Sequence, residues 1–329
     1  MRKKNLAAVL VIVMAVTALF TTGCGNDAGD GGDKSIPKIG LVQYVEHPSL
    51  DMIRANMIAQ LAEEGFIDGD TVIIDYKSGQ GDTNTLKTIC QSFSANNYDM
   101  IIAIATPAAQ SALGETTDIP IIFAAVTDPV GAELVDSLEV PGGNVTGTSD
   151  VVSATKIMDL AVQITPDIKT IGTVYSSAEI NSVTVVAELK AYAKAHGMTV
   201  IESPVMNTTE IQQATQSLVG KVDMVFTPID NGVASAMSAI VGVLNKAGIP
   251  FYVGADTMVE DGGLATDGVN YVALGQETGK MVAEILNGGD TASTPVKVMA
   301  ETQIYVNADT AAKLGITIPQ DILDKAVIF

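Results

Sequence analysis

The stretch YDMIIAIATPAAQ at residues 98–110 places a short apolar run directly before Thr-Pro. The run from Ile101 to Ala105 has the length and composition of a buried strand. Thr106 is a favourable N-cap and proline is favoured at the first helical position, so a helix is expected to begin here. The stretch therefore predicts a strand that leads directly into a helix whose first N–H groups are free.

The second half of the chain repeats this pattern. The stretch VDMVFTPIDN at residues 222–231 again joins an apolar run to Thr-Pro, and both copies lead through a helical stretch to Ile-Pro, at residues 119–120 and 249–250. This weak internal repeat is consistent with two lobes of one design. A chain of 329 residues also exceeds what one hydrophobic core usually organises.

Short β-branched runs alternate with longer amphipathic stretches over residues 36–126, and again over residues 153–253. Such alternation predicts parallel strands joined by crossover helices in each half. The expected fold is α/β, with two doubly wound parallel-sheet lobes. Ligands of open α/β sheets bind outside the carboxyl ends of the strands, so the groove between the lobes is the expected binding site.

The N-terminus has the order of an export signal: a basic start, an apolar run and small residues. The apolar run from Leu6 to Phe20 is 15 residues long, which is shorter than the about 20 residues that span a bilayer. Gly23-Cys24 resembles the end of a bacterial lipoprotein signal, which implies cleavage after residues 1–23 and a lipid anchor on Cys24; ordinary secretion is the alternative. Residues 24–35, rich in Gly and Asp, are expected to form a flexible tether.

Composition excludes several classes of function. The formal net charge of −20 argues against nucleic-acid binding and against adhesion to anionic lipid head groups. We find no phosphate-binding or nucleophile motif, so neither a cofactor nor catalysis is expected. His47 is the one histidine near the expected groove, which argues against a transition-metal site. Cys90 lies at helical spacing among apolar residues and is expected to be a buried small hydrophobe.

The loops after the strands carry the candidate ligand-binding groups. Helix starts at Thr106 and Thr127 could donate N–H groups to a carboxylate, and Asp128 or Asp230 could accept a hydrogen bond from an ammonium group. Each of these groups could instead stabilise the fold without contacting a ligand, because Thr106 and Asp230 can cap helices and Asp128 precedes proline in a turn. Aromatic stacking could come from Tyr44 or Tyr175, which could equally be packing residues.

These loops together resemble the substrate-binding proteins of bacterial ABC transporters, in the subfamily that includes tryptophan and tyrosine binders. The stretches that carry the resemblance are QYVEHPSLD (43–51), AIATPAAQ (103–110), AVTDPVG (125–131), PGGNVTGTSD (141–150), QSLVGKVD (216–223) and DNGVASAM (230–237). Carried over by position, the implied ligand contacts are Gln43, His47, Thr106, Thr127, Asp128, Ser149, Tyr175, Ser176, Ser177, Asn181, Asp230 and Asn231. We add Asp256 to these implied contacts. It lies in Gly254-Ala255-Asp256-Thr257, at a place where members of the family tend to have an acidic pair.

The resemblance also implies a type I periplasmic-binding-protein fold that closes on its ligand by a hinge. Its three crossings between lobes would lie near Thr148, Thr266 and Ala292. Lobe 1 would then comprise residues 36–148 and 267–292, and lobe 2 residues 149–266 and 293–329.

The implied protein is a monomer, held outside the cytoplasm by lipid on Cys24, that delivers an amino acid to an ABC permease. The preferred ligand is an aromatic amino acid, because helix starts and carboxylates together suit a zwitterion. A nucleoside or sugar ligand, a ligand-sensing ectodomain and an α/β enzyme are the alternatives.

Overall fold

The computed structural model describes residues 36–329, which form one compact unit. The expected signal sequence, the lipid anchor on Cys24 and the tether at residues 24–35 lie outside the described residues. Within residues 36–329, no helix combines the length and the apolar character needed to cross a membrane.

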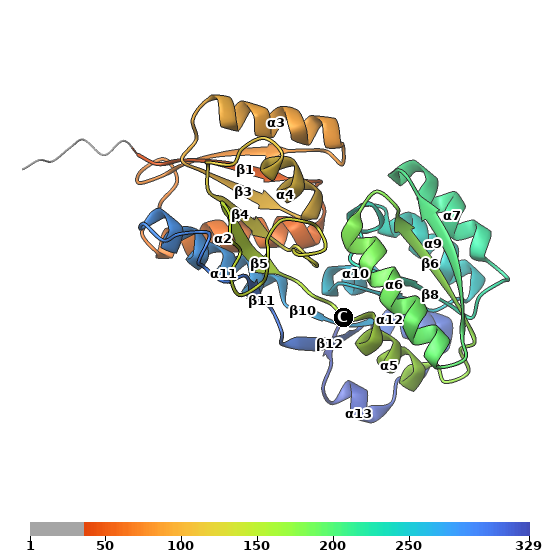
Figure 1. Cartoon of the computed structure of the whole chain (residues 1–329). Coiled ribbons are helices and arrows are strands. Elements are labelled where there is room, and N and C mark those ends of the chain that lie inside the picture. The colour runs from red at the N-terminus through yellow and green to blue at the C-terminus, as the bar shows by residue number, and fades with distance from the viewer. Residues whose placement is uncertain (1–35) are drawn as a thin grey trace, which may run out of the picture. The chain divides into compact units, whose positions relative to one another are not determined.

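The first lobe is built on a six-stranded parallel sheet (Figure 1). Its strands, in spatial order, are β11 (Lys297–Val298), β5 (Val145–Ser149), β4 (Ile121–Ala124), β3 (Met100–Ile104), β1 (Lys38–Gln43) and β2 (Ile73–Ser78). β3 and β4 are wholly buried, as their continuous apolar runs predict. The strand order reverses between β1 and β3, so a ligand site is favoured at that position.

Helices cover both faces of this sheet. One face carries α3 (Thr83–Ala95) and α4 (Thr106–Leu113), and the other carries α2 (Pro48–Glu63) and α11 (Tyr271–Leu286). Cys90 on α3 is fully buried among apolar side chains, which confirms its expected role as a small hydrophobe.

α2 and α11 pack closely because glycine lies between them. A Cβ atom on Gly275 would lie 2.7 Å from the carbonyl oxygen of Ile53, and one on Gly279 would lie 2.7 Å from that of Met57. No side chain fits at either position without a shift of the backbone. The return of the chain to the first lobe through α11 therefore depends on these two glycines.

The second lobe contains a seven-stranded sheet. Its strands, in spatial order, are β13 (Val327–Ile328), β12 (Thr302–Val306), β10 (Ala265–Val269), β9 (Phe251–Val253), β8 (Met224–Thr227), β6 (Thr170–Ser176) and β7 (Thr199–Val205). All neighbours are parallel except β10 and β12. The order reverses between β6 and β8, which places a second switch point in this lobe.

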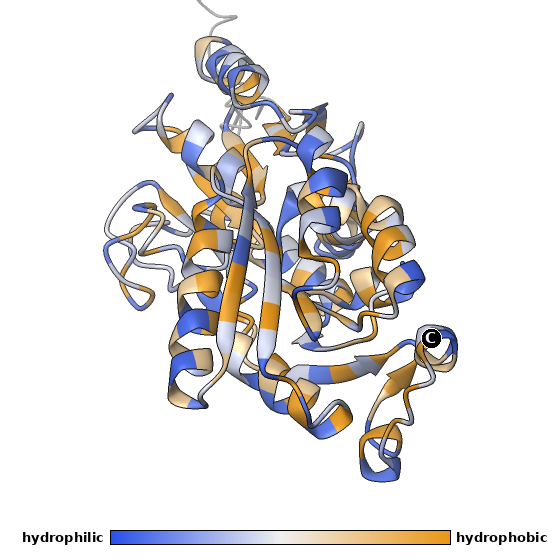
Figure 2. Ribbon diagram, turned by 90° about the vertical axis from the view of Figure 1, so that its right-hand side faces the viewer, coloured by the Kyte–Doolittle hydropathy of each residue, from blue (hydrophilic) through white to orange (hydrophobic). Residues whose placement is uncertain are grey.

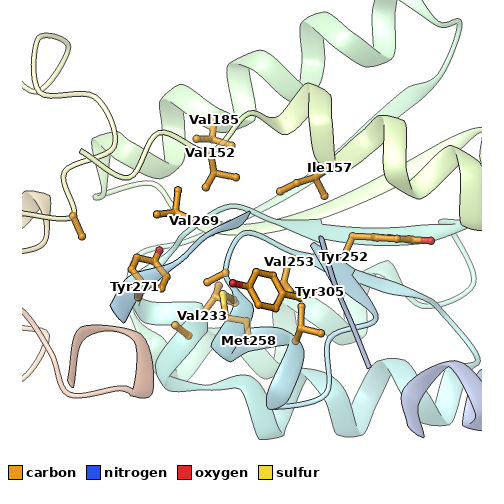
Figure 3. Close-up of a cluster of buried hydrophobic side chains, with 14 of the residues drawn as sticks. Val152, Ile157, Val185, Val233, Tyr252, Val253, Met258, Val269, Tyr271 and Tyr305 are labelled. Atoms are coloured by element: carbon orange, nitrogen blue, oxygen red, sulfur yellow. The ribbon is translucent and has the colours of Figure 1, made fainter. Parts of the chain in front are cut away.

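α5 (Ala154–Ile164) and α6 (Ile180–Ala195) pack together on one face of the second sheet, and α7 (Ile211–Leu218) and α9 (Met237–Ala247) pack together on the other. The remaining helical turns are η1 (Thr208–Glu210), α8 (Asn231–Ser235), α10 (Asp256–Glu260), α12 (Ala308–Leu314) and α13 (Gln320–Leu323). Figure 2 shows hydrophobic and hydrophilic residues interleaved along the helices. The core contains three tyrosines that are packed among aliphatic side chains: Tyr252, Tyr271 and Tyr305 (Figure 3).

The crossings between the lobes differ in detail from the expected positions. β5 still belongs to the first sheet at Ser149 and β10 to the second sheet at Val269, so these two crossings come slightly later than expected. The third crossing near Ala292 is wrong, because Lys297 and Val298 pair with β5 in the first sheet. The chain therefore enters the second lobe for the last time between β11 and β12.

Candidate functional site

β1 borders the switch point of the first sheet, and β6 borders that of the second sheet. The carboxyl ends of these two strands lead to the two walls of one cavity. The cavity has a volume of about 190 Å³. Its first-lobe wall is formed by Tyr44, Val45, Gln80 and Gly81, and its second-lobe wall by Ser176, Glu179, Val205, Met206, Asn207, Thr208, Ile211, Gly232 and Ser235. Sites for drug-sized ligands usually enclose about 300–1,000 Å³. The interlobe cavity is smaller than this range, so it has room for one small molecule.

The second-lobe wall contains a buried network around two carboxyl groups. Asp230 caps α8, since its Oδ1 accepts a hydrogen bond from the Val233 N–H at 2.8 Å. Its Oδ2 accepts from the Ser176 N–H at 2.6 Å and from the Ser182 hydroxyl at 2.7 Å. Both oxygens of Asp230 are therefore occupied within the lobe, in agreement with the capping alternative.

Glu179 is the second buried carboxyl group, and it was not among the expected site residues. It accepts hydrogen bonds from the Asn231 side-chain amide and from the N–H groups of Asn231 and Gly232, both at 3.3 Å. Burial, together with the nearby charge of Asp230, raises the pKa of Glu179 above its ordinary value. Burial likewise raises the pKa of Asp230, although its hydrogen bonds oppose the shift.

Three side-chain hydrogen bonds join the lobes close to this network. His47 Nε2 lies 3.2 Å from Asn231 Oδ1, Ser49 contacts Thr257 through the two hydroxyl groups, and the Thr184 hydroxyl lies 3.4 Å from Asp128 Oδ2. Burial lowers the pKa of His47 to about 4, so its ring is neutral at physiological pH. Asn231 therefore connects His47 of the first lobe to Glu179 of the second.

Two alanines at the ends of neighbouring strands have positive φ angles. Ala105, after β3, has φ 79° and ψ 155°, and Ala125, after β4, has φ 56°. Such conformations cost about 1–3 kcal/mol for a residue other than glycine and are concentrated at functional sites. The turn at Ala105 starts α4 directly at the end of the sheet, as the Thr-Pro pattern predicts. The prediction that Thr106 caps this helix is wrong, because Ala105 is the N-cap and Thr106 is the first helical residue. The Thr106 hydroxyl is buried and has no hydrogen-bond partner among the described residues.

Several other expected contacts serve the scaffold. The Gln43 amide donates to Val45 and Asp51 and accepts from Arg54 at 2.6 Å, so it holds the loop after β1. The Tyr175 hydroxyl donates to Glu202 at 2.8 Å on the neighbouring strand. Neither residue lines the interlobe cavity.

Polar groups at the turns are likewise bound within the protein. Asp128 Oδ1 accepts from the Gly131 N–H at 2.9 Å, as the turn alternative predicts. The Ser177 hydroxyl donates to the carbonyl of Val205, and the Asn181 amide donates to that of Ile229. Of the ligand contacts carried over from the family, Ser176 lines the cavity, and so does the stacking candidate Tyr44.

The remaining expected residues lie near the crossings between lobes. The Thr127 and Tyr271 hydroxyls donate to Asp150 at 3.0 and 3.2 Å, and the Ser149 hydroxyl donates to the carbonyl of Thr127. This cluster ties the first crossing, at Asp150, to the second, at Tyr271. Burial raises the pKa of Asp150 to about 6, and that of Asp256 at the start of α10 also to about 6.

Five cavity residues were not predicted from the sequence: Glu179, Gln80, Met206, Asn207 and Thr208. All five follow a strand closely, β6 for Glu179, β2 for Gln80 and β7 for the others. The rule that the loops after strands hold the site could therefore have found them. Among residues 36–329, no group of three or more His, Cys, Asp or Glu residues could hold a metal ion.

Two much larger hollows occur on the second lobe alone. One of about 550 Å³ lies between α7 and α9, and one of about 440 Å³ is lined by residues such as Ile164, Asp223 and Leu314 of the second lobe. Neither contacts the first lobe or the carboxyl ends of the strands at the switch points. A further hollow of about 240 Å³ lies between the lobes, beside His47 of the first lobe and Met237 of the second. The cavity of about 190 Å³ is the one that the buried carboxyl group of Glu179 lines, and it is the one called the interlobe cavity.

Comparison with known proteins agrees with this architecture. The family model described as ABC transporter substrate binding protein matches residues 38–328. A tyrosine-binding protein of Clostridioides difficile (strain R20291) is 41% identical over 320 residues, which cover 95% of this chain and 92% of the relative.

Solved structures show the same similarity. An ABC domain from Streptococcus pneumonia in complex with L-Trp has a TM-score of 0.87 at 44% identity, covering 89% of this chain and 99% of that one. A ligand-free, open structure of a substrate-binding protein with adhesive properties from Clostridium difficile has a TM-score of 0.68 at 41% identity, with the same coverage. The predicted α/β fold with two doubly wound lobes and the family resemblance are confirmed. The chain belongs to the ABC transporter substrate-binding protein family.

Proposed function

We propose that this substrate-binding protein captures an aromatic α-amino acid in the interlobe cavity and delivers it to an ABC permease, without catalysing a reaction. The observation that carries the proposal is a small cavity with a buried carboxyl pair on one lobe and Tyr44 on the other. Two relatives above 40% identity, one named for tyrosine and one solved with L-Trp, support the aromatic ligand.

The cavity has groups suited to each part of such a ligand. Tyr44, Val205, Met206 and Ile211 offer apolar and aromatic surface to a ring. A nucleoside or sugar would use the hydroxyl and amide groups but would leave the buried carboxyl group without a cation. An uncharged ligand is therefore the second choice.

Ligand capture is proposed to close the lobes by the hinge. A ligand can favour the closed form only through contacts that need both lobes, and the cavity walls come from both. The greater similarity to the ligand-bound relative than to the ligand-free open one, at nearly equal identity, supports this view.

The proposed ligand can be tested directly by fluorescence. Because the chain contains no tryptophan, the fluorescence of added L-Trp reports only on the ligand. We expect a saturable rise in its anisotropy and displacement by L-tyrosine, but no displacement by a nucleoside or sugar. An anisotropy of L-Trp that does not rise with added protein would reject the aromatic assignment.

Membrane attachment is proposed to come from lipid on Cys24, with the protein working as a monomer outside the cytoplasm. Cys24→Ser removes the thiol that would accept the lipid, so the variant should move from the membrane fraction to the soluble fraction. A variant that stays in the membrane fraction would contradict the anchor.

A further inference from the structure

Two buried carboxyl groups, Glu179 in the cavity wall and Asp230 in the network around it, have no cationic partner among residues 36–329. Glu179 is 2% exposed and Asp230 is fully buried. Among residues 36–329, the ion pairs all lie elsewhere and involve neither group. An isolated buried carboxylate is costly, and such a group usually holds a proton unless a cation arrives.

The two carboxyl groups differ in their access to the cavity. Asp230 is held by three donors at 2.6–2.8 Å and does not line the cavity. Glu179 accepts from the Asn231 side-chain amide and, at 3.3 Å, from two backbone N–H groups, but it lines the cavity. A second acceptor lies beside it. The Asn181 side chain contacts Glu179 Oε2 at 3.5 Å, is 3% exposed, and its amide oxygen has no partner among the described residues.

Building on the proposed function, we propose that Glu179 accepts the ammonium group of the bound amino acid, and that binding releases the proton held by the Glu179–Asp230 pair in the ligand-free protein. The carboxyl O–H of the pair gives its proton to water, and the carboxylate that remains pairs with the ammonium group. Asp230 then holds α8 and raises the proton affinity of its neighbour, rather than contacting the ligand.

The groups that face Glu179 agree with this assignment. Asp230 faces it from α8, Tyr44 from the first lobe, and His47 through the Asn231 amide. Burial and the charge of Glu179 raise the pKa of Tyr44, and burial lowers that of His47, so both are neutral. Of these facing groups none is cationic, which leaves the ligand's ammonium to supply the positive charge.

The test is calorimetric titration of the full chain with L-tyrosine near neutral pH, in two buffers of different ionisation enthalpy. We expect close to one proton released per ligand, and an affinity that rises with pH at a rate approaching the roughly tenfold per pH unit set by release of one proton. Tyrosine binding without proton release would overturn the inference while leaving the proposed function intact. Absence of heat with any amino acid would overturn both.

A pair of matched variants locates the proton. Glu179→Gln should abolish the release and weaken binding by roughly tenfold or more, which is the size of one charge-assisted contact. Glu284→Gln makes the same chemical change at an exposed position of α11 and should behave as the wild type. Wild-type binding and release in a Glu179→Gln protein that unfolds cooperatively would reject the role of Glu179. If that variant does not fold, the wild-type proton count still decides.

Discussion

Replacing Asp230 with Asn separates a structural from a ligand-binding role for this residue. The amide can still accept the Val233 N–H through one oxygen, but its NH₂ group then faces the Ser176 N–H, which Asp230 Oδ2 accepts at 2.6 Å. The Ser182 hydroxyl can turn and accept instead of donating, whereas the Ser176 N–H cannot. One buried donor is left unsatisfied and one charge-assisted hydrogen bond is lost, so Asp230→Asn should destabilise the fold by about 2–4 kcal/mol.

Urea unfolding followed by circular dichroism measures this loss. We expect a lower midpoint with an unchanged slope, because the surface exposed on unfolding stays the same. Asp223→Asn is the matched control, since Asp223 Oδ2 also accepts two backbone N–H groups but is exposed to water. It should cost less than about 1 kcal/mol. An unchanged midpoint for Asp230→Asn, with a roughly tenfold loss of tyrosine affinity, would refute the capping role.

Two further predictions concern packing and pH. Gly275→Ala should destabilise the protein by about 1–3 kcal/mol, because its Cβ would meet the Ile53 carbonyl, whereas Gly242→Ala in open space on α9 should stabilise it by about 0.5–1 kcal/mol. Thermal unfolding checks both, and equal shifts would contradict the packing argument. Because the folded pKa of Asp150 is about 6 and the unfolded value is lower, the folded state binds more protons between them. The free energy of unfolding should therefore fall by about 3 kcal/mol as pH rises from about 4 to about 7. Asp150→Asn should remove most of this dependence on pH. An equally steep dependence in the variant would show that Asp150 is not responsible.

The fold was predictable because its signals are local and repeated. Apolar runs that end at Thr106 and near Thr227 mark both strands and helix starts, and the structure has β3 with α4 and β8 with α8 at these positions. The helical stretch expected between Thr-Pro and Ile-Pro in the second half is divided in the structure into α8 and α9, on either side of Ala236. Nothing in the local pattern marks that break.

The site was less predictable because burial and direction depend on tertiary contacts. Gln43 ends a strand as expected, but its amide turns into the first lobe toward Arg54 and Asp51. Glu179 lies between the expected Ser177 and Asn181, and its importance comes from the distant Asp230, which the sequence does not place beside it. The third crossing was misplaced for a similar reason, since β11 has only two residues and is defined by its pairing with β5.

An amino acid is proposed to bind between the lobes in the cavity of Tyr44, Glu179 and Ser235. This proposal can be tested by filling the cavity with a bulky side chain. Ser235→Phe adds a ring at the exposed rim of the interlobe cavity, whereas Ser238→Phe adds the same ring on α9, where it lines the other hollows. We predict that L-Trp anisotropy no longer rises with Ser235→Phe and still rises with Ser238→Phe. Undiminished binding by a folded Ser235→Phe protein, or loss only in Ser238→Phe, would contradict the account.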